Sequence, residues 1–280
     1  MSVATPILDE AAERLRQMYG ADLDGLTVQR VVVGVFFTGV MLSDGSTGVA
    51  YTPPEMIERA STRILGDSYR AYRGRSAAEM IGSALDGAFA HIVRLASLNA
   101  LSVQLFEQKR FGEGREGDFS EIPELITGRK VCMVGAIIPL LKKFGKMNAR
   151  EIAIVDKKKE TQAEATLGRF VALDKTAEAL GVCETAVITG AAIANGSMDE
   201  LLRYLPADAA IAVGGPTAGF APTPLFRRGV TAVGTVVVSD GEQALEIISE
   251  GGGGYQLFKK CVRKINLLNE PALARVLQRR

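Results

Sequence analysis

Small and polar residues stand directly after short apolar runs in the second half of the chain. Four such runs occupy residues 130–134, 151–155, 185–188 and 209–213. Each has the length of a buried strand, and a helical pattern follows each loop, which is typical of a parallel sheet covered by helices. Because ligands bind beyond the carboxyl ends of parallel strands, these loops are the first candidates for a small-ligand site.

The loop after the first run, from Gly135 to Pro139, reads GAIIP and lacks the GxGxxG pattern of dinucleotide sites, so a standard NAD site is disfavoured. Asp156 follows the second run, 156 − 135 = 21 residues after Gly135. This spacing is usual between a phosphate-binding loop and the carboxylate that holds a ribose. Asp156 is therefore a candidate for binding a nucleoside cofactor or a metal. The alternative is that it only caps the next helix.

The loop after the third run combines hydrogen-bonding groups with backbone freedom. Thr189 and Asn195 can donate hydrogen bonds, and Gly190 and Gly196 allow the backbone to approach a ligand. The Asn195-Gly196 pair also fits a simple turn. Both interpretations stay open at the level of sequence.

The loop after the fourth run, residues 214–224, holds three glycines and three prolines. Glycine and proline together fix an unusual backbone path and leave amides and hydroxyls exposed. This composition indicates that Gly215, Pro216 and Thr217 line a site.

The histidine and cysteine content limits the chemistry available. The chain has one histidine, His91, and three widely spaced cysteines without a CxxC pair. Sites that need two histidines, and Ser-His-Asp or Cys-His arrangements, are not supported. Cys132 and Cys183 are expected to be buried structural thiols, and His91 is expected to be a capping or packing residue. Oxygen donors are plentiful, which suits a hard cation or a chelated metal, and Asp156 is the best single metal ligand.

A cytoplasmic location is expected because the three widely spaced cysteines are typical of reduced thiols, and the balanced charge disfavours nucleic acid and membranes as partners. The sequence has 33 basic and 32 acidic residues, a net charge of +1. Such a balance gives no overall field for nucleic acid or an anionic membrane. The start of the chain lacks a signal-peptide pattern, and no window offers about 18 uninterrupted apolar residues. A homodimer is expected because it is the commonest assembly.

The elements that must position these loops are expected in two domains. Residues 1–118 form an α+β domain and residues 119–280 a Rossmann-like parallel α/β domain, with the boundary after the glycine-rich, charged stretch at 112–118. The first domain is expected to contain a hairpin of strands 28–40 and 47–51, and helices at 5–19, 54–64, 76–86 and 88–106. In the second domain, a last pair of short strands is expected over 230–238, and helices at 138–145, 161–180, 197–204, 222–228, 241–250 and 255–268.

Several segments resemble the putative heavy-metal-chelation family, long described as a domain of unknown function. The resemblance is carried by VGVFFTGV (33–40), LASLNAL (95–101), KVCMVG (130–135), ITGAAIANGSMDELL (188–202) and GGPTAGFAPTPLFRRGVTAVGTVVVSDGE (214–242). It covers nearly the whole chain after the first 20 or so residues. The resemblance implies an enolase-like N-terminal α+β domain, a Rossmann-like C-terminal domain and a site in the cleft between them.

Carried over by position, the resemblance implies two walls of that cleft. Thr38, Gly39 and Asn99 form the N-terminal wall. The facing residues are Gly135, Pro139, Asp156, Thr189, Gly190, Asn195, Gly215, Pro216 and Thr217. Where the family pattern has Glu after the second strand, this chain has Asp156, which is one methylene shorter.

Two functions follow as expectations. The first is a binding or handling protein for a metal ion or a metal–chelator complex. The alternative is an enzyme that uses a nucleoside cofactor, S-adenosylmethionine or a nucleotide, for group transfer by positioning.

Overall fold

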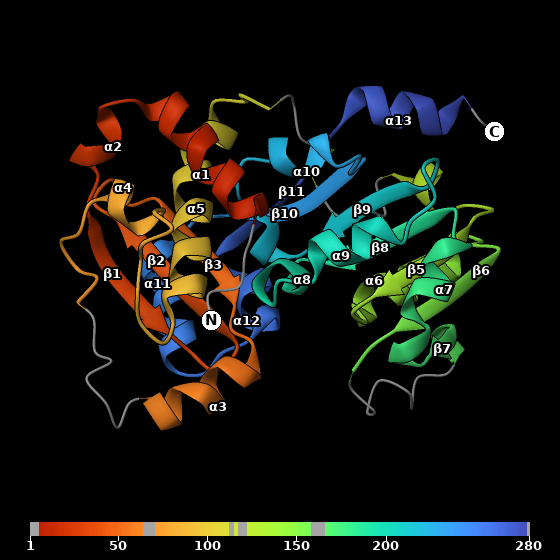
Figure 1. The fold of residues 1–280 in the computed structure, drawn as a ribbon, viewed down its shortest axis with the longest axis horizontal. Helices are drawn as coiled ribbons and strands as arrows, with labels where there is room; N and C mark the ends of the chain where they lie inside the picture. Colours follow the sequence, from red (N-terminus) through yellow and green to blue (C-terminus); the bar gives the residue numbers. More distant parts are fainter. Residues whose placement is uncertain (1–5, 64–70, 112–114, 117–121, 158–165, 279–280) are drawn as a thin grey trace.

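The computed structural model describes residues 6–63, 71–111, 115–116, 122–157 and 166–278 and contains two sheets (Figure 1). The first sheet is antiparallel, with strands β1 (Val28–Val33), β2 (Phe37–Leu42) and β3 (Thr47–Tyr51) in that order. The prediction of a single strand over 28–40 is wrong. The chain turns back at residues 34–36, where the Gly34 amide donates a hydrogen bond to the Phe37 carbonyl at 2.9 Å.

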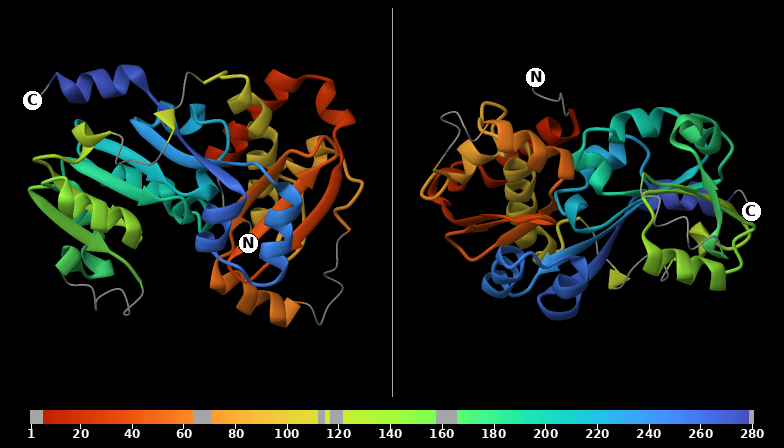
Figure 2. Two further views of the ribbon diagram at one scale, coloured as in Figure 1. Left: turned by 180° about the vertical axis from the view of Figure 1, so that it is seen from behind. Right: turned by 90° about the horizontal axis from the view of Figure 1, so that it is seen from below.

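Helices cover both faces of this first sheet. The N-terminal part contains α1 (Pro6–Tyr19), α2 (Asp22–Gly25), α3 (Pro54–Arg63), α4 (Ala77–Met80) and α5 (Ala90–Glu107). α5 lies on one face, and α11 (Gly241–Ser249) lies on the other, as the right-hand view of Figure 2 shows. Ser76 and Glu79 form a capping box at the start of α4. However, its helix ends at Met80 rather than residue 86, since the Gly82 amide turns back to the Glu79 carbonyl.

The second sheet has eight strands in the order β4-β11-β10-β9-β8-β5-β6-β7. Six neighbouring strands, β10 to β7, run parallel, and β11 is antiparallel to β10. Their bounds are β4 (Arg115–Glu116), β5 (Lys130–Val134), β6 (Glu151–Val155), β7 (Arg169–Val171), β8 (Thr185–Thr189), β9 (Ala210–Gly214), β10 (Ala232–Val238) and β11 (Val262–Leu268). The predicted fold class, an α+β part followed by a Rossmann-like α/β part, is confirmed.

Two predicted helices are wrong because sheet pairing overrides local preference. The segment expected as a helix over 255–268 forms α12 (Gly254–Lys260) and then β11, which pairs with β10 along seven residues. In the segment 161–180, residues 169–171 form β7 and α7 occupies only Thr176–Gly181. The pair of strands expected over 230–238 is the single strand β10.

The remaining helices cover the two faces of the second sheet. α6 (Ile138–Lys146) and α13 (Glu270–Leu277) pack on one face. The other face carries α7, α8 (Ala191–Ala194), α9 (Met198–Arg203) and α10 (Thr223–Arg227). Within the described residues, no helix is long and apolar enough to span a membrane.

The N-terminal and C-terminal parts share a hydrophobic core. Buried residues of α1 and α5 belong to one cluster with those of β8 and α8. The Arg228 guanidinium joins the parts at the surface, with 2.8 Å contacts to Glu10 of α1 and to Asp199 of α9. The predicted boundary after residue 118 lies outside the described residues and stays a prediction.

Two buried thiols give the fold an expected alkaline sensitivity. Burial raises the pKa of Cys132 from 9.0 to about 12 and that of Cys183 from 9.0 to about 11. The folded state therefore keeps both protons where the unfolded chain releases them. Stability should be complete below pH 9 and decline as the pH rises toward 11–12, by up to about 1.4 kcal/mol per pH unit for each thiol.

Urea unfolding between pH 8 and 10.5 measures this decline. Cys132→Ala should unfold more easily at pH 8 but lose less stability over the interval than the unsubstituted protein. An equal loss in both proteins would show that the Cys132 thiol does not contribute. Burial also raises the pKa of Tyr19 to about 12, so this phenol lowers the stability at high pH as well. Tyr19 is present in both proteins, and its contribution therefore cancels in the comparison.

Candidate functional site

The order of the parallel strands places a topological switch point between β5 and β8. From β5 the chain adds β6 and β7 on one side, then returns to add β8, β9 and β10 on the other. The two loops that leave β5 and β8 therefore diverge toward opposite faces of the sheet. In open α/β sheets the resulting crevice at the carboxyl ends of the strands is where ligands bind. Gly135 directly follows β5, and Thr189 is the last residue of β8.

Gly135 allows these two strand ends to approach each other. Its φ of +80° lies in the left-handed region, and a Cβ built there would stand 2.3 Å from Thr189 Cγ2. Its amide donates to the Val155 carbonyl at 2.8 Å. α6 begins three residues later, with the exposed Pro139 in its first turn and no side chain of the described residues capping it.

Asp156 lies beside this glycine loop, as its spacing from Gly135 predicts. Its half-buried carboxylate accepts a hydrogen bond from the Ala136 amide, with 2.5 Å between Oδ2 and N. The carboxylate thus holds the loop that follows β5. The alternative prediction was that Asp156 caps the helix expected over 161–180. The first residues of that segment lie outside the described residues.

The loops after β8 and β9 pack closely and share a backbone hydrogen bond. The Gly190 amide donates to the Gly214 carbonyl at 2.6 Å. A Cβ at Gly190 would stand 3.1 Å from the Ala218 nitrogen, so glycine permits this close packing. Gly215 has a φ of +120°, and its amide donates to the Gly234 carbonyl at 2.9 Å. Pro216 then begins a 3₁₀ turn, η5 (Pro216–Ala218). We refer to Gly135, Asp156, Thr189, Gly190 and Gly215 together as the strand-end site.

Thr217 and Asn99 connect the strand-end site to the first sheet. Thr217 Oγ1 accepts a hydrogen bond from the Tyr51 amide at 3.0 Å. Asn99 Nδ2 donates to the Val49 carbonyl at 2.7 Å and to the Pro216 and Thr217 carbonyls at 3.3 Å each. Both side chains are buried. Their observed contacts position the loop after β9 against β3.

Three predicted site residues make packing or turn contacts in the structure. Thr38 is buried, and its hydroxyl lies 2.9 Å from that of Thr52. Gly39 faces α11, where a Cβ would stand 2.4 Å from Leu245 Cδ2. Asn195 is exposed at the end of α8, and its Oδ1 accepts from the Ser197 amide at 3.1 Å. The Asn195 contact is the turn that the sequence offered as an alternative.

The Ser197 side chain does not cap α9, although it directly precedes that helix. The Ser197 hydroxyl donates instead to Asn195 Oδ1 at 2.7 Å, and no side chain caps α9. The Glu200 carboxylate accepts a hydrogen bond from the Tyr204 hydroxyl at 2.5 Å.

Two residues near the strand-end site, Tyr51 and Glu55, were not predicted from the sequence. Tyr51 ends β3 and is half-buried. Burial, followed by the negative charges of Glu55 and Asp156, raises the pKa of its phenol. Lys157 Nζ lies 3.6 Å from Glu55 Oε1, so an exposed ion pair joins the segment after β6 to α3. One feature of the sequence could have identified Tyr51. It ends a predicted strand and stands directly before Thr52-Pro53-Pro54, where a helix is expected to begin.

The described residues do not group the side chains that most often bind metal ions. Within the described residues, no three histidine, cysteine, aspartate or glutamate side chains gather closely enough to hold one. All three cysteines are buried, as predicted for Cys132 and Cys183, and burial lowers the pKa of the half-buried His91. Among the described residues, Asp156 is therefore not part of a group of three or more histidine, cysteine, aspartate or glutamate side chains.

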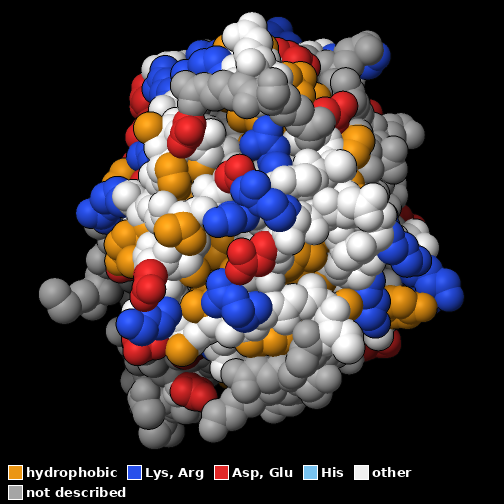
Figure 3. Space-filling view, turned by 90° about the vertical axis from the view of Figure 1, so that its right-hand side faces the viewer, with side chains coloured by type: hydrophobic (Ala, Val, Ile, Leu, Met, Phe, Trp, Pro, Cys, Tyr) orange, Lys and Arg blue, Asp and Glu red, His pale blue; other side chains and the backbone are white. Residues whose placement is uncertain are grey.

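Charge is mixed on the face at the right of Figure 1, where β6 and β7 lie. Figure 3 shows basic side chains there with acidic ones between them. Two short ion pairs account for part of this pattern. Arg150 contacts Glu184 at 2.5 Å, and Arg169 contacts Glu151 at 2.9 Å.

Comparison with models of protein families gives two matches. The DUF364 model, described as "Putative heavy-metal chelation", matches residues 87–267, which is more than half of the chain. The protein belongs to this family. A second model with the same description, DUF4213, matches residues 16–102 of this family member. The family resemblance inferred from the sequence is thereby confirmed. The curated proteins include no match.

Solved structures of the DUF364 family share the fold. A protein of unknown function from Pyrococcus horikoshii is 18% identical, with a TM-score of 0.71, over 94% of this chain and 99% of that one. Another, from Desulfitobacterium hafniense DCB-2, is 16% identical, with a TM-score of 0.66, over 92% of this chain and 99% of that one. At these identities the likeness supports the fold alone.

Proposed function

We propose that this protein binds a metal–chelator complex at the strand-end site, opposite Tyr51 and Glu55. The observation that carries the proposal is the meeting of Gly135 and Thr189 at the switch point, with the Asp156 carboxylate beside them. This position is where ligands of open α/β sheets bind. The family description, "Putative heavy-metal chelation", supports a metal-containing ligand.

A complex suits the available groups better than an ion alone. The described side chains do not provide three grouped ligands for a bare ion, so a chelator would have to complete its coordination. The start of α6 lacks a side-chain cap, and helix starts attract anionic groups. Lys157 forms only an exposed ion pair with Glu55, so an anionic chelator would compete with that carboxylate for the ammonium group.

The alternative enzyme with a nucleoside cofactor has less support from the geometry. One Asp156 oxygen already accepts from the Ala136 amide, whereas a ribose diol is usually bound by both oxygens of such a carboxylate. The spacing from Gly135 and the switch point are compatible with both ligands. S-adenosylmethionine and adenosine triphosphate therefore belong in the binding experiment.

Calorimetric titration tests the proposal with defined probes. Ferric, nickel and zinc ions are added as chlorides and as citrate complexes, together with both nucleoside cofactors. We expect saturable binding of at least one citrate complex and weaker binding of the matching chloride. Asp156→Ala should weaken binding roughly 10- to 100-fold, since it removes a charged acceptor and releases the glycine loop. Asp24→Ala, an exposed carboxylate of α2, serves as the control.

Two results would overturn the proposal. One is the absence of binding by every ion and complex. The other is tight binding of a nucleoside cofactor that Asp156→Asn abolishes, which would support the enzyme instead. Elemental analysis and mass spectrometry of the purified protein identify any ligand carried through purification.

A further inference from the structure

Among the residues that the structure describes, the first sheet has one covered edge and one largely open edge. At the β3 edge, the Tyr51 amide donates to Thr217, and η5 packs against the strand. At the β1 edge, only the beginning of the strand has a neighbour among the described residues. There the Val28 amide donates to the Arg75 carbonyl at 2.9 Å, and the Gly74 amide donates to the Val28 carbonyl at 2.8 Å.

The register of β1 leaves backbone groups pointing outward at its other end. The Gly34–Phe37 bond makes those two residues a hydrogen-bonded pair. Pairs alternate along an antiparallel ladder, so Val33 and Val31, opposite Thr38 and Val40, direct their N–H and C=O groups away from β2. Within the part of the chain that the structure describes, no backbone group of another element pairs with Val31 or Val33 on that side.

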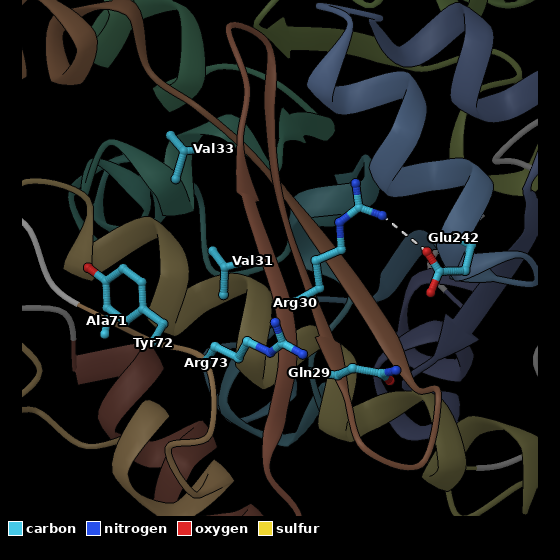
Figure 4. A pocket seen from close by; sticks show the side chains of 8 residues that line it. All are labelled: Gln29, Arg30, Val31, Val33, Ala71, Tyr72, Arg73 and Glu242. Carbon is cyan, nitrogen blue, oxygen red and sulfur yellow. Dashed lines mark hydrogen bonds and ion pairs between the residues drawn. The ribbon is translucent and has the colours of Figure 1, made fainter.

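A pocket of about 580 Å³ lies along this open edge. Figure 4 shows side chains of β1 between Ala71 and Tyr72 on one side and Glu242 of α11 on the other. The Val33 side chain is 37% exposed, and beyond it Val35 and Phe36 at the turn are 58% and 49% exposed. The edge therefore offers apolar side chains next to unpaired backbone groups.

The lining of this pocket carries more positive than negative charge. It contains Arg30, Arg73 and one carboxylate, Glu242. Arg30 Nη1 lies 3.1 Å from Glu242 Oε2, and both side chains remain largely exposed. Among the described residues, Arg73 makes no ion pair. An acidic side chain of a segment bound alongside β1 could therefore form an ion pair with the Arg73 guanidinium.

We infer that the β1 edge binds an extended acidic segment of a partner protein as a fourth strand. Outward N–H and C=O groups two residues apart match the repeat of another extended backbone, which satisfies all of them at once. A second copy of this chain would bring a second Arg73 to the joint, and the two like charges oppose that pairing. The inference does not depend on the strand-end site.

Fluorescence anisotropy with synthetic probes tests this inference. The first probe is a labelled ten-residue peptide of alternating valine and glutamate. The second has the same sequence with alternate backbone nitrogens methylated, which blocks strand addition. We expect the first to bind with saturation and the second to bind at least about tenfold more weakly. Hydrogen exchange should show protection of the Val31 and Val33 amides by the first peptide.

Two variants locate the binding surface. Arg73→Glu should weaken the first peptide at least about tenfold because it reverses the uncommitted charge. Val31→Pro should do the same, since it removes an outward N–H without losing a bond to β2. Arg14→Glu on the exposed face of α1 is the control and should change nothing.

Three results would overturn the inference: equal binding of the methylated peptide, no saturable binding by the unsubstituted protein, or a dimer in sedimentation that Val31→Pro dissociates.

Discussion

Gly48→Ala should reduce the free energy of unfolding by at least about 3 kcal/mol or prevent folding altogether. A Cβ at Gly48 would stand 2.2 Å from both the Ala96 oxygen and the Ala100 nitrogen of α5. These are backbone atoms within a helix, so no rotamer change relieves the overlap. The whole helix would have to move away from β3, and the buried side chains between them would lose contact.

Two other glycines provide matched comparisons in urea unfolding. Gly39→Ala, in the same sheet, meets the end of the flexible Leu245 side chain at 2.4 Å and should cost less, about 1–2 kcal/mol. Gly145→Ala lies in α6 with nothing within 4 Å, so it should be neutral or stabilise by about 0.5–1 kcal/mol. If Gly48→Ala destabilises no more than Gly39→Ala, the close approach of α5 does not limit stability.

Gly135→Ala should have the largest effect on ligand binding, a loss of about 100-fold or more in the titrations proposed above. Alanine is strained at a φ of +80°, and its Cβ would overlap Thr189 Cγ2 at 2.3 Å. Relief requires the strand ends at the switch point to separate. That movement also displaces the Ala136 amide from Asp156, so the whole site changes shape.

Gly128→Ala is the control for backbone strain alone. Gly128 has a similar φ of +72°, but a Cβ there meets nothing within 4 Å. Both variants should lose about 1 kcal/mol of stability from strain, whereas only Gly135→Ala should lose affinity. Equal affinities for the two variants and the unsubstituted protein would place the ligand elsewhere.

The central strands could be predicted from sequence because their burial is encoded locally. β5 and β6 begin and end at the predicted residues, since apolar runs bounded by polar or glycine residues leave little ambiguity. β7 and β11 could not be predicted in this way. β7 has only three residues, and β11 mixes charged and apolar residues that also suit a helix, so pairing with a distant strand decides both.

The same distinction applies to the strand-end site. Gly135 and Asp156 come together as predicted because adjacent parallel strands bring their ends to one edge. The roles of Asn99 and Tyr51 depend on contacts with residues more than 100 positions away along the chain, at Pro216 and Thr217. The β1–β2 turn was missed because residues 34–37 lack the Asn-Gly pair that usually marks a hairpin.

The packing of α11 on the first sheet also affects how the chain can fold during synthesis. β3 ends at Tyr51, but the helix that covers one face of its sheet ends only at Ser249. A ribosome needs roughly 10–40 s to add the intervening 249 − 51 = 198 residues. For that time the nascent sheet exposes Phe37, Met41 and Val49, which α11 later buries. We therefore expect the first sheet to keep an unprotected apolar face until α11 has been synthesised.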